Sequence, residues 1–106
     1  IYYICTMDSY VLFVDTSSST LLLPVKNFLG GDIHGTNTVG LSFEKAPLSH
    51  KITLTVDDET GPNVLLKIGE LFHGYTGPVI IFDDIKGVYP VPEIERIAGI
   101  NKIFTK

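Results

Sequence analysis

Short apolar runs constrain the fold of this chain more than any other feature of its sequence. Uninterrupted runs of aliphatic and phenylalanine side chains reach only four residues, at 11–14 and 79–82. A membrane-spanning helix needs about 20 apolar residues in succession, so the sequence predicts no transmembrane helix. Short apolar runs closed by turn-forming residues are typical of buried β-strands.

The clearest strand pattern covers residues 51–57, where apolar side chains alternate with polar ones. Pro24 has no N–H to donate, so the segment that contains it is predicted to be an edge strand or to bend. Gly30-Gly31-Asp32 gives the strongest turn signal in the chain. We expect strands at residues 10–15, 21–29, 33–36, 39–44, 51–57, 79–82, 85–91 and 103–104.

One helix is predicted at residues 62–73. Thr60 or Gly61 can cap it, Pro62 suits its first turn, and Gly74 is placed to end it. Its apolar residues recur at helical spacing, so this face would cover an open side of the sheet or, alternatively, bind a partner. They are Val64, Leu65, Ile68, Leu71 and Phe72.

The whole chain is predicted to form one domain, residues 1–106, because no linker, repeat or low-complexity tract interrupts it. A second, shorter helix is expected from Pro92 or Glu93 to Gly99, with Ile94 and Ile97 on one side. The fold class is therefore mainly β with one or two short helices, as a small barrel or as a small α+β sandwich. We favour the barrel because closure removes exposed sheet edges.

Acidic residues outnumber basic ones. Twelve Asp and Glu against eight Lys and Arg give a net charge of −4. Long-range attraction to nucleic acid or to an acidic membrane is disfavoured, although a few bases that converge in an oligomer would still form a local basic site. Cys5 is the only cysteine, so no intrachain disulfide can form, which indicates a reducing, cytoplasmic compartment. The chain begins with Ile1, so an upstream residue or Met7 is its natural start.

The sequence shows no pattern typical of catalysis or metal binding. Its serines lack a Gly-x-Ser-x-Gly setting and its three histidines lie at unrelated positions, so we expect a non-enzymatic protein with no catalytic residue. The acids at 57–59 and 83–84 are interpreted as solvated turn residues, because neighbouring strand residues face opposite sides. His34 and Asp32 form a potential ligand pair, but no second His follows at coordinating spacing. We therefore expect no metal site and no cofactor.

Two stretches resemble the motifs of the Sm-like (LSm) proteins. In residues 25–36, continued by 39–46, Gly30 is followed five residues later by Gly35, and an alternating apolar strand comes after the loop. Ile85-Lys86-Gly87 and the apolar residues after it are similar to the second motif of that family. The resemblance implies a small, strongly bent five-stranded β-barrel, for which a glycine in the bent strand is suited.

The same resemblance implies a cyclic homo-oligomer in which neighbouring copies pair their strand edges. Such a ring would bind single-stranded RNA, or alternatively DNA, near its central pore and act in RNA or DNA processing. By motif position, Asn37 would contact a base, and Lys86, in place of the family's usual Arg, would line the neighbouring loop with Gly87. His34 or Tyr89 would add a stacking surface, although no motif carries either residue over.

A second hypothesis places the chain among structural proteins. Its overall character also resembles that of marine phage proteins, which implies a non-enzymatic phage structural or assembly protein that makes protein–protein contacts. The acidic balance, the lack of an Arg cluster and the apolar stripe of the predicted helix favour this alternative. A phage-encoded protein of this kind would work in the host cytoplasm.

Overall fold

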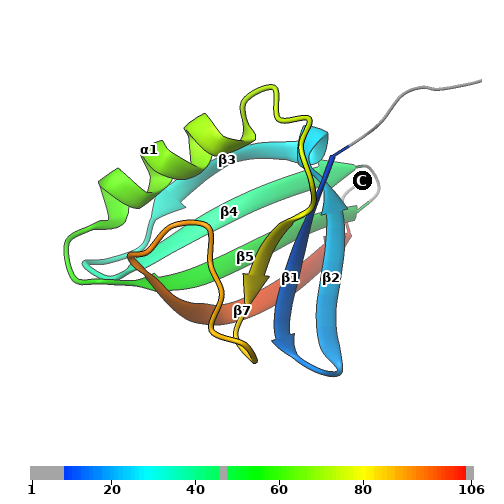
Figure 1. The fold of residues 1–106 in the computed structure, drawn as a ribbon. Coiled ribbons are helices and arrows are strands. Elements are labelled where there is room, and N and C mark those ends of the chain that lie inside the picture. The colour runs from blue at the N-terminus through cyan, green and yellow to red at the C-terminus, as the bar shows by residue number, and fades with distance from the viewer. Residues whose placement is uncertain (1–8, 46–47, 105–106) are drawn as a thin grey trace, which may run out of the picture.

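Two β-sheets and one α-helix make up the fold in the computed structural model, which describes residues 9–45 and 48–104 (Figure 1). The three-stranded sheet, here called sheet A, has the order β2-β1-β6. Its strands are β1 (Tyr10–Thr16), β2 (Ser19–Pro24) and β6 (Ile80–Asp83). β2 runs antiparallel to β1, whereas β6 runs parallel to it.

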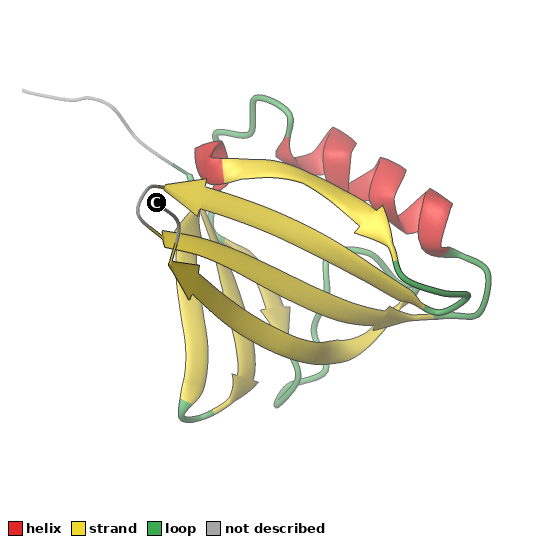
Figure 2. Ribbon diagram, turned by 180° about the vertical axis from the view of Figure 1, so that it is seen from behind, coloured by secondary structure: helices red, strands yellow, loops and turns green. Residues whose placement is uncertain are grey.

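The four-stranded sheet, here called sheet B, is antiparallel throughout and has the order β3-β4-β5-β7. Its strands are β3 (Phe28–Ile33), β4 (Thr38–Lys45), β5 (Leu48–Val56) and β7 (Ile94–Phe104). A short 3-10 helix, η1 (Val25–Asn27), connects β2 of sheet A to β3. Sheet B is strongly curved, and the strands of sheet A cross it steeply in both views (Figures 1 and 2).

Helix α1 (Gly61–Phe72) lies along β3 (Figure 1). Its buried side chains Val64, Ile68 and Phe72 belong to the core. The backbone of Gly31 comes so close to the helix that an added Cβ would lie 2.7 Å from Leu65 Cδ2. A glycine in β3 therefore lets the helix pack tightly against the sheet.

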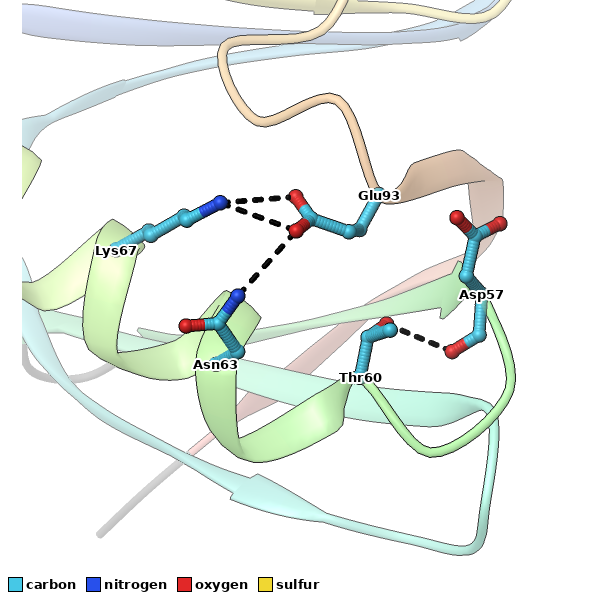
Figure 3. A network of polar contacts seen from close by, with 5 residues as sticks. All are labelled: Asp57, Thr60, Asn63, Lys67 and Glu93. Carbon is cyan, nitrogen blue, oxygen red and sulfur yellow. Dashed lines mark hydrogen bonds and ion pairs between the residues drawn. The ribbon is translucent and has the colours of Figure 1, made fainter.

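A polar network also fastens α1 to the start of β7 (Figure 3). Lys67 Nζ lies 3.0 Å from Glu93 Oε2, and Asn63 Nδ2 donates to the same oxygen at 3.3 Å. The Thr60 hydroxyl donates a hydrogen bond to the carbonyl of Asp57 at 2.7 Å, and it makes no capping hydrogen bond with the backbone of α1. The hydrogen bond from Lys67 is the main reason that the pKa of Glu93 is lowered.

A chain of aromatic rings joins the two sheets and the helix. Phe13 of β1 packs 4.8 Å from Phe82 and 5.8 Å from Phe43 of sheet B, between ring centroids. Phe43 contacts Phe28, whose ring meets that of Phe72 edge-on at 5.0 Å. These rings lie within one cluster of buried side chains. The core therefore lies where sheet A, sheet B and α1 meet.

Several sequence predictions are confirmed. The helix expected at 62–73 is α1, and the strands expected at 10–15, 39–44, 51–57 and 79–82 correspond to β1, β4, β5 and β6. The segment that contains Pro24 is both an edge strand and bent, because η1 follows β2 directly. Cys5 and Met7 lie outside the described residues.

The turn predicted at Gly30-Gly31-Asp32 is wrong. These residues lie inside β3, which has a register shift between Phe28 and Gly30, and the chain reverses instead through residues 34–37. The two adjacent glycines allow a bulge and the close approach of α1, and they do not form a hairpin turn. The strand expected at 33–36 is reduced to Ile33, the last residue of β3.

The C-terminal helix predicted up to Gly99 is also wrong, because these residues belong to β7. Register shifts in the pairing with β5 skip Glu95 and Ala98, so each acts as an extra residue. Two such bulges place Ile94 and Ile97 on the inner face at a spacing of three, which imitates helical periodicity. The bulges therefore explain why the pattern resembled a helix.

The strand expected at 85–91 is wrong as well. Its residues form a turn in which only Val88 makes an isolated bridge, to Asp83. The Asp83 carboxylate accepts hydrogen bonds from the backbone N–H groups of Ile85 and Lys86, at 2.9 and 3.0 Å. Gly87 then adopts a φ of +67°, which favours glycine. These features close a tight turn where a strand was expected.

The two sheets do not join into a closed barrel among the described residues, since no strand ladder connects sheet A to sheet B. The structure is mainly β with one α-helix and two sheets, which fits the α+β sandwich named as the alternative. Among the same residues, no helix has both the length and the apolarity needed to cross a membrane.

Candidate interaction surface

The residues that the Sm-like resemblance assigns to nucleic acid lie in two separate parts of the molecule. His34 and Asn37 belong to the connection between β3 and β4, whereas Lys86, Gly87 and Tyr89 follow β6. The β6–β7 connection runs back to the end of sheet B where the β3–β4 connection lies (Figures 1 and 2), but among the described residues no hydrogen bond or ion pair joins the two groups. Within a single copy, the structure therefore does not bring the five residues together.

Asn37 is exposed at the tip of its loop, and its backbone carbonyl accepts a hydrogen bond from Val56 N at 2.9 Å. Its side-chain Oδ1 accepts one from the Thr38 hydroxyl at 3.3 Å. The side-chain amide nitrogen, the group that would donate to a base, takes part in neither bond. The loop is thus held through its backbone.

His34 belongs to a polar cluster on the outer face of sheet B. Its Nε2 lies 2.9 Å from Asp32 Oδ1, and Lys51 Nζ lies 3.5 Å from Asp32 Oδ2. The cluster covers Gly40, where an added Cβ would come within 3 Å of all three side chains. The cluster consists of paired charged groups, and its contacts include no hydroxyl or thiol that could act as a nucleophile.

Tyr89 is half-buried, and its hydroxyl is already engaged. It donates to Asp84 Oδ1 at 2.5 Å, and the same oxygen accepts the N–H of Ile97 at 2.9 Å. Burial, followed by this hydrogen bond, raises the pKa of Tyr89. Lys86 and Gly87 are exposed in the turn just before it. Stacking of a base on Tyr89 would have to leave this hydrogen bond in place.

Among residues 9–45 and 48–104, no group of three or more His, Cys, Asp or Glu side chains is placed to hold a metal ion. Asp32 and His34 are in contact, as their spacing suggested, and their third partner is Lys51, a cation. Asp32 therefore forms salt bridges with His34 and Lys51, and the group is not an open set of metal ligands.

The outer face of sheet A carries a row of apolar side chains. Leu12 of β1 is paired with Leu22 of β2 and with Ile81 of β6, so the three side chains lie side by side across the sheet. Leu22 is 52% exposed and Ile81 is 40% exposed. Solvated sheet faces usually carry polar side chains, so this apolar row is a candidate contact surface.

Sequence analysis missed this surface although a signal was present. In the runs 11–14 and 79–82, apolar residues follow one another without alternating with polar ones. Because successive strand residues face opposite sides, an unbroken run makes both faces of a strand apolar. One face enters the core, and the other stays exposed.

The edge strands of the two sheets also differ, in their charges and in their bulges. β2 contains no charged residue, and the single charge of β6, Asp83, is held within its own turn. In sheet B, β3 carries Asp32 and a bulge, and β7 carries Glu95, Arg96 and two bulges. Charges and bulges protect exposed edges from pairing with other chains. The edge strands of sheet A have neither free charges nor bulges of their own, and their only protection among the described residues is Pro24 at the end of β2 and the bridge of Val88 to Asp83 of β6.

A second apolar region borders α1. An open groove of about 460 Å³ is lined by Leu65, Leu66, Gly69, Glu70 and His73. Leu66 is 61% exposed, and an added Cβ at Gly69 would meet nothing within 4 Å. Unlike sheet A, this groove does not coincide with an unprotected strand edge.

Comparison of the chain with protein-family models, with curated proteins and with solved structures finds no match.

Proposed function

We propose that this chain is a non-enzymatic assembly protein that associates with copies of itself through sheet A. The observation that carries the proposal is the apolar row Leu22–Leu12–Ile81, which ends at both sides on strand edges without free charges. Apolar surface next to an open edge favours the addition of another strand, because burial and backbone hydrogen bonding then act together.

The directions of the strands suit pairing between copies. β2 runs antiparallel to β1 and β6 runs parallel to it, so β2 and β6 run antiparallel at opposite edges of sheet A. β2 of one copy beside β6 of the next would continue the sheet as an antiparallel ladder. Leu22 would then lie beside Ile81 of the neighbouring copy, and the apolar row would run on across the contact.

Charge does not oppose contact between copies at these two edges. Each chain carries a net charge of −4, so two copies repel one another over most other orientations. β2 has no charged residue, and the Asp83 carboxylate of β6 accepts two backbone hydrogen bonds within its own chain. Contact between unlike edges is head-to-tail and closes into a ring when the rotation between copies permits it. We therefore expect a cyclic homo-oligomer.

The test is the mass in solution, measured by light scattering for the wild type, Leu22→Lys and Leu66→Lys. We expect a discrete oligomer for the wild type and an 11.6 kDa monomer for Leu22→Lys, because a charge on β2 opposes pairing. Leu66→Lys alters a similarly exposed leucine on α1 and should keep the wild-type mass. A monomeric wild type, or an unchanged mass for Leu22→Lys, would contradict the proposal.

Single-stranded nucleic-acid binding stays a prediction of the Sm-like resemblance. Its test uses a short RNA and the variants Asn37→Ala and Lys86→Ala. Affinity should fall in both variants and should weaken as salt rises if the two loops contact RNA. Protein that shows no excess absorbance at 260 nm, and affinities that neither variant changes, would leave self-association as the function.

A further inference from the structure

The turn after β6 bonds back to the free edge of that strand. Asp83 donates its N–H to the carbonyl of Val88 at 2.7 Å, and its own carbonyl accepts the N–H of Val88 at 2.9 Å. The two bonds form an isolated antiparallel bridge, so Val88 lies where a residue of a further strand would lie. The free edge of β6 is therefore already occupied at its last residue.

The direction of the backbone groups shows which residue of β6 is left. Successive residues of a strand turn their N–H and C=O groups to opposite edges. Asp84 donates its N–H to the carbonyl of Val14 in β1, whereas Asp83 turns its groups to Val88. Ile81, two residues before Asp83, therefore turns its own groups to the free edge. Of residues 80–83, Ile81 alone can then exchange hydrogen bonds with another copy at this edge.

The free edge of β2 has the matching alternation. Val14 turns its carbonyl to β6, so Leu12, two residues earlier, also turns its backbone groups to β6. Leu22 is paired with Leu12 and therefore turns its N–H and C=O groups away from β1, to the free edge. With Leu22 of one copy opposite Ile81 of the next, the two residues can exchange two hydrogen bonds.

Val88 competes with the second copy for the same edge. In an antiparallel ladder with Leu22 opposite Ile81, Thr20 of the incoming copy comes opposite Asp83. Val88 of the receiving copy already bonds to Asp83 there. One residue of the chain itself thus imitates the neighbouring strand and has to leave before the full ladder can form.

We propose that Val88 is a self-cap that limits assembly, an inference that rests on the self-association proposed above. In the free chain, Val88 is bonded to Asp83; in the oligomer, β2 of the neighbouring copy replaces it. The cap can move because Val88 is 47% exposed and follows Gly87, whose φ is +67°. The chain on its far side is held, since the hydroxyl of Tyr89 donates to Asp84.

Displacement of the cap leaves the rest of the turn in place. The Asp83 carboxylate accepts the N–H groups of Ile85 and Lys86, and neither bond involves Val88. The negative charge at the edge therefore stays held in the oligomer. The two bonds of the bridge are exchanged for bonds to the neighbour, while burial of Leu22 is added. Assembly is then weakened by the fraction of chains in which the cap is closed.

The first experiment weakens the cap without touching either strand. Gly87 and Gly74 have φ values of +67° and +60°, and an added Cβ would meet no atom within 4 Å at either position. Alanine is strained in this conformation. Sedimentation equilibrium should therefore show up to about tenfold tighter assembly for Gly87→Ala. The control Gly74→Ala, which changes the end of α1, should keep the wild-type dissociation constant. Equal dissociation constants for Gly87→Ala and the wild type would overturn the cap.

The second experiment separates the cap from the self-association on which it rests. Amide hydrogen exchange of the wild type is compared between dilute and concentrated protein. On assembly, the N–H of Ile81 should gain protection, while that of Val88 should lose it. Gained protection at Ile81 with unchanged protection at Val88 would overturn the cap and leave self-association standing. Unchanged protection at Ile81 would overturn both.

Discussion

Sheets A and B share one core but present different outer faces. Sheet B exposes a charge-paired cluster around Asp32, and its edge strands carry bulges and charges. Sheet A exposes the row around Leu12, and its edge strands lack free charges. An isolated protein is expected to protect all of its edges. This difference between the outer faces and edges of the two sheets is the basis of the proposal that sheet A associates with another copy.

The largest effect should separate the two faces of β1. Phe13 is fully buried between the aromatic rings of both sheets, so Phe13→Ala should lower the free energy of unfolding by about 3–5 kcal/mol. Leu12→Ala, on the outer face, should cost about 1 kcal/mol or less. Urea denaturation at one fixed protein concentration measures both, because assembly itself adds stability. Equal losses would mean that the two faces do not differ.

Two glycines near α1 should respond in opposite directions. An added Cβ at Gly31 would lie 2.7 Å from Leu65 and 2.8 Å from the carbonyl of Gly40, so Gly31→Ala should destabilise the fold by about 1–3 kcal/mol. Gly69 faces open space in the helix, and Gly69→Ala should stabilise the fold by up to about 1 kcal/mol. Thermal midpoints give both signs. A neutral Gly31→Ala would show that β3 can move away from the helix.

The ion pair of Glu93 with Lys67 should make the stability of the fold depend on pH. The hydrogen bond from Lys67 lowers the pKa of Glu93, so its stabilising effect is present above its ordinary pKa and is lost as the pH falls. Glu93→Gln should therefore lower the thermal midpoint at pH 7 and match the wild type in strong acid. A variant whose deficit is constant over this range would exclude a role for the charge.

The smallest effect is expected on the outer face of sheet B. Lys51 forms an exposed pair with Asp32 at 3.5 Å, and such pairs contribute about 0–1 kcal/mol. Lys51→Met should leave both the stability and the mass in solution almost unchanged. If Lys51→Met altered the oligomer as strongly as Leu22→Lys, sheet B would also belong to the contact.

The sequence was informative where structure is local. The alternation at 51–57 and the helical spacing before Phe72 gave β5 and α1 correctly, because each element has one buried face. β7 was missed because its two bulges change the apolar spacing from two to three. The glycines of β3 were wrongly interpreted as a turn, because they are needed for the close contact with α1, which is distant in the sequence.

The candidate site was predictable only in part. Sequence analysis considered Asp32 and His34 only as a potential ligand pair, and the structure shows them in contact with each other. The row Leu22–Leu12–Ile81 depends on which strand flanks β1, and local patterns do not specify a parallel partner so far away in the chain. The unbroken apolar runs pointed to two apolar faces, but not to the strands that would share them.

The parallel pairing of β1 with β6 also bears on synthesis. Val11 meets Ile80, about 70 positions later, and closing a loop of that length costs chain entropy before any contact repays it. During synthesis, the β1–β2 hairpin is therefore made before its third strand and stays without it until residues 80–83 are added. During that interval both faces of the hairpin are apolar and uncovered, so we expect the incomplete sheet to be prone to aggregation.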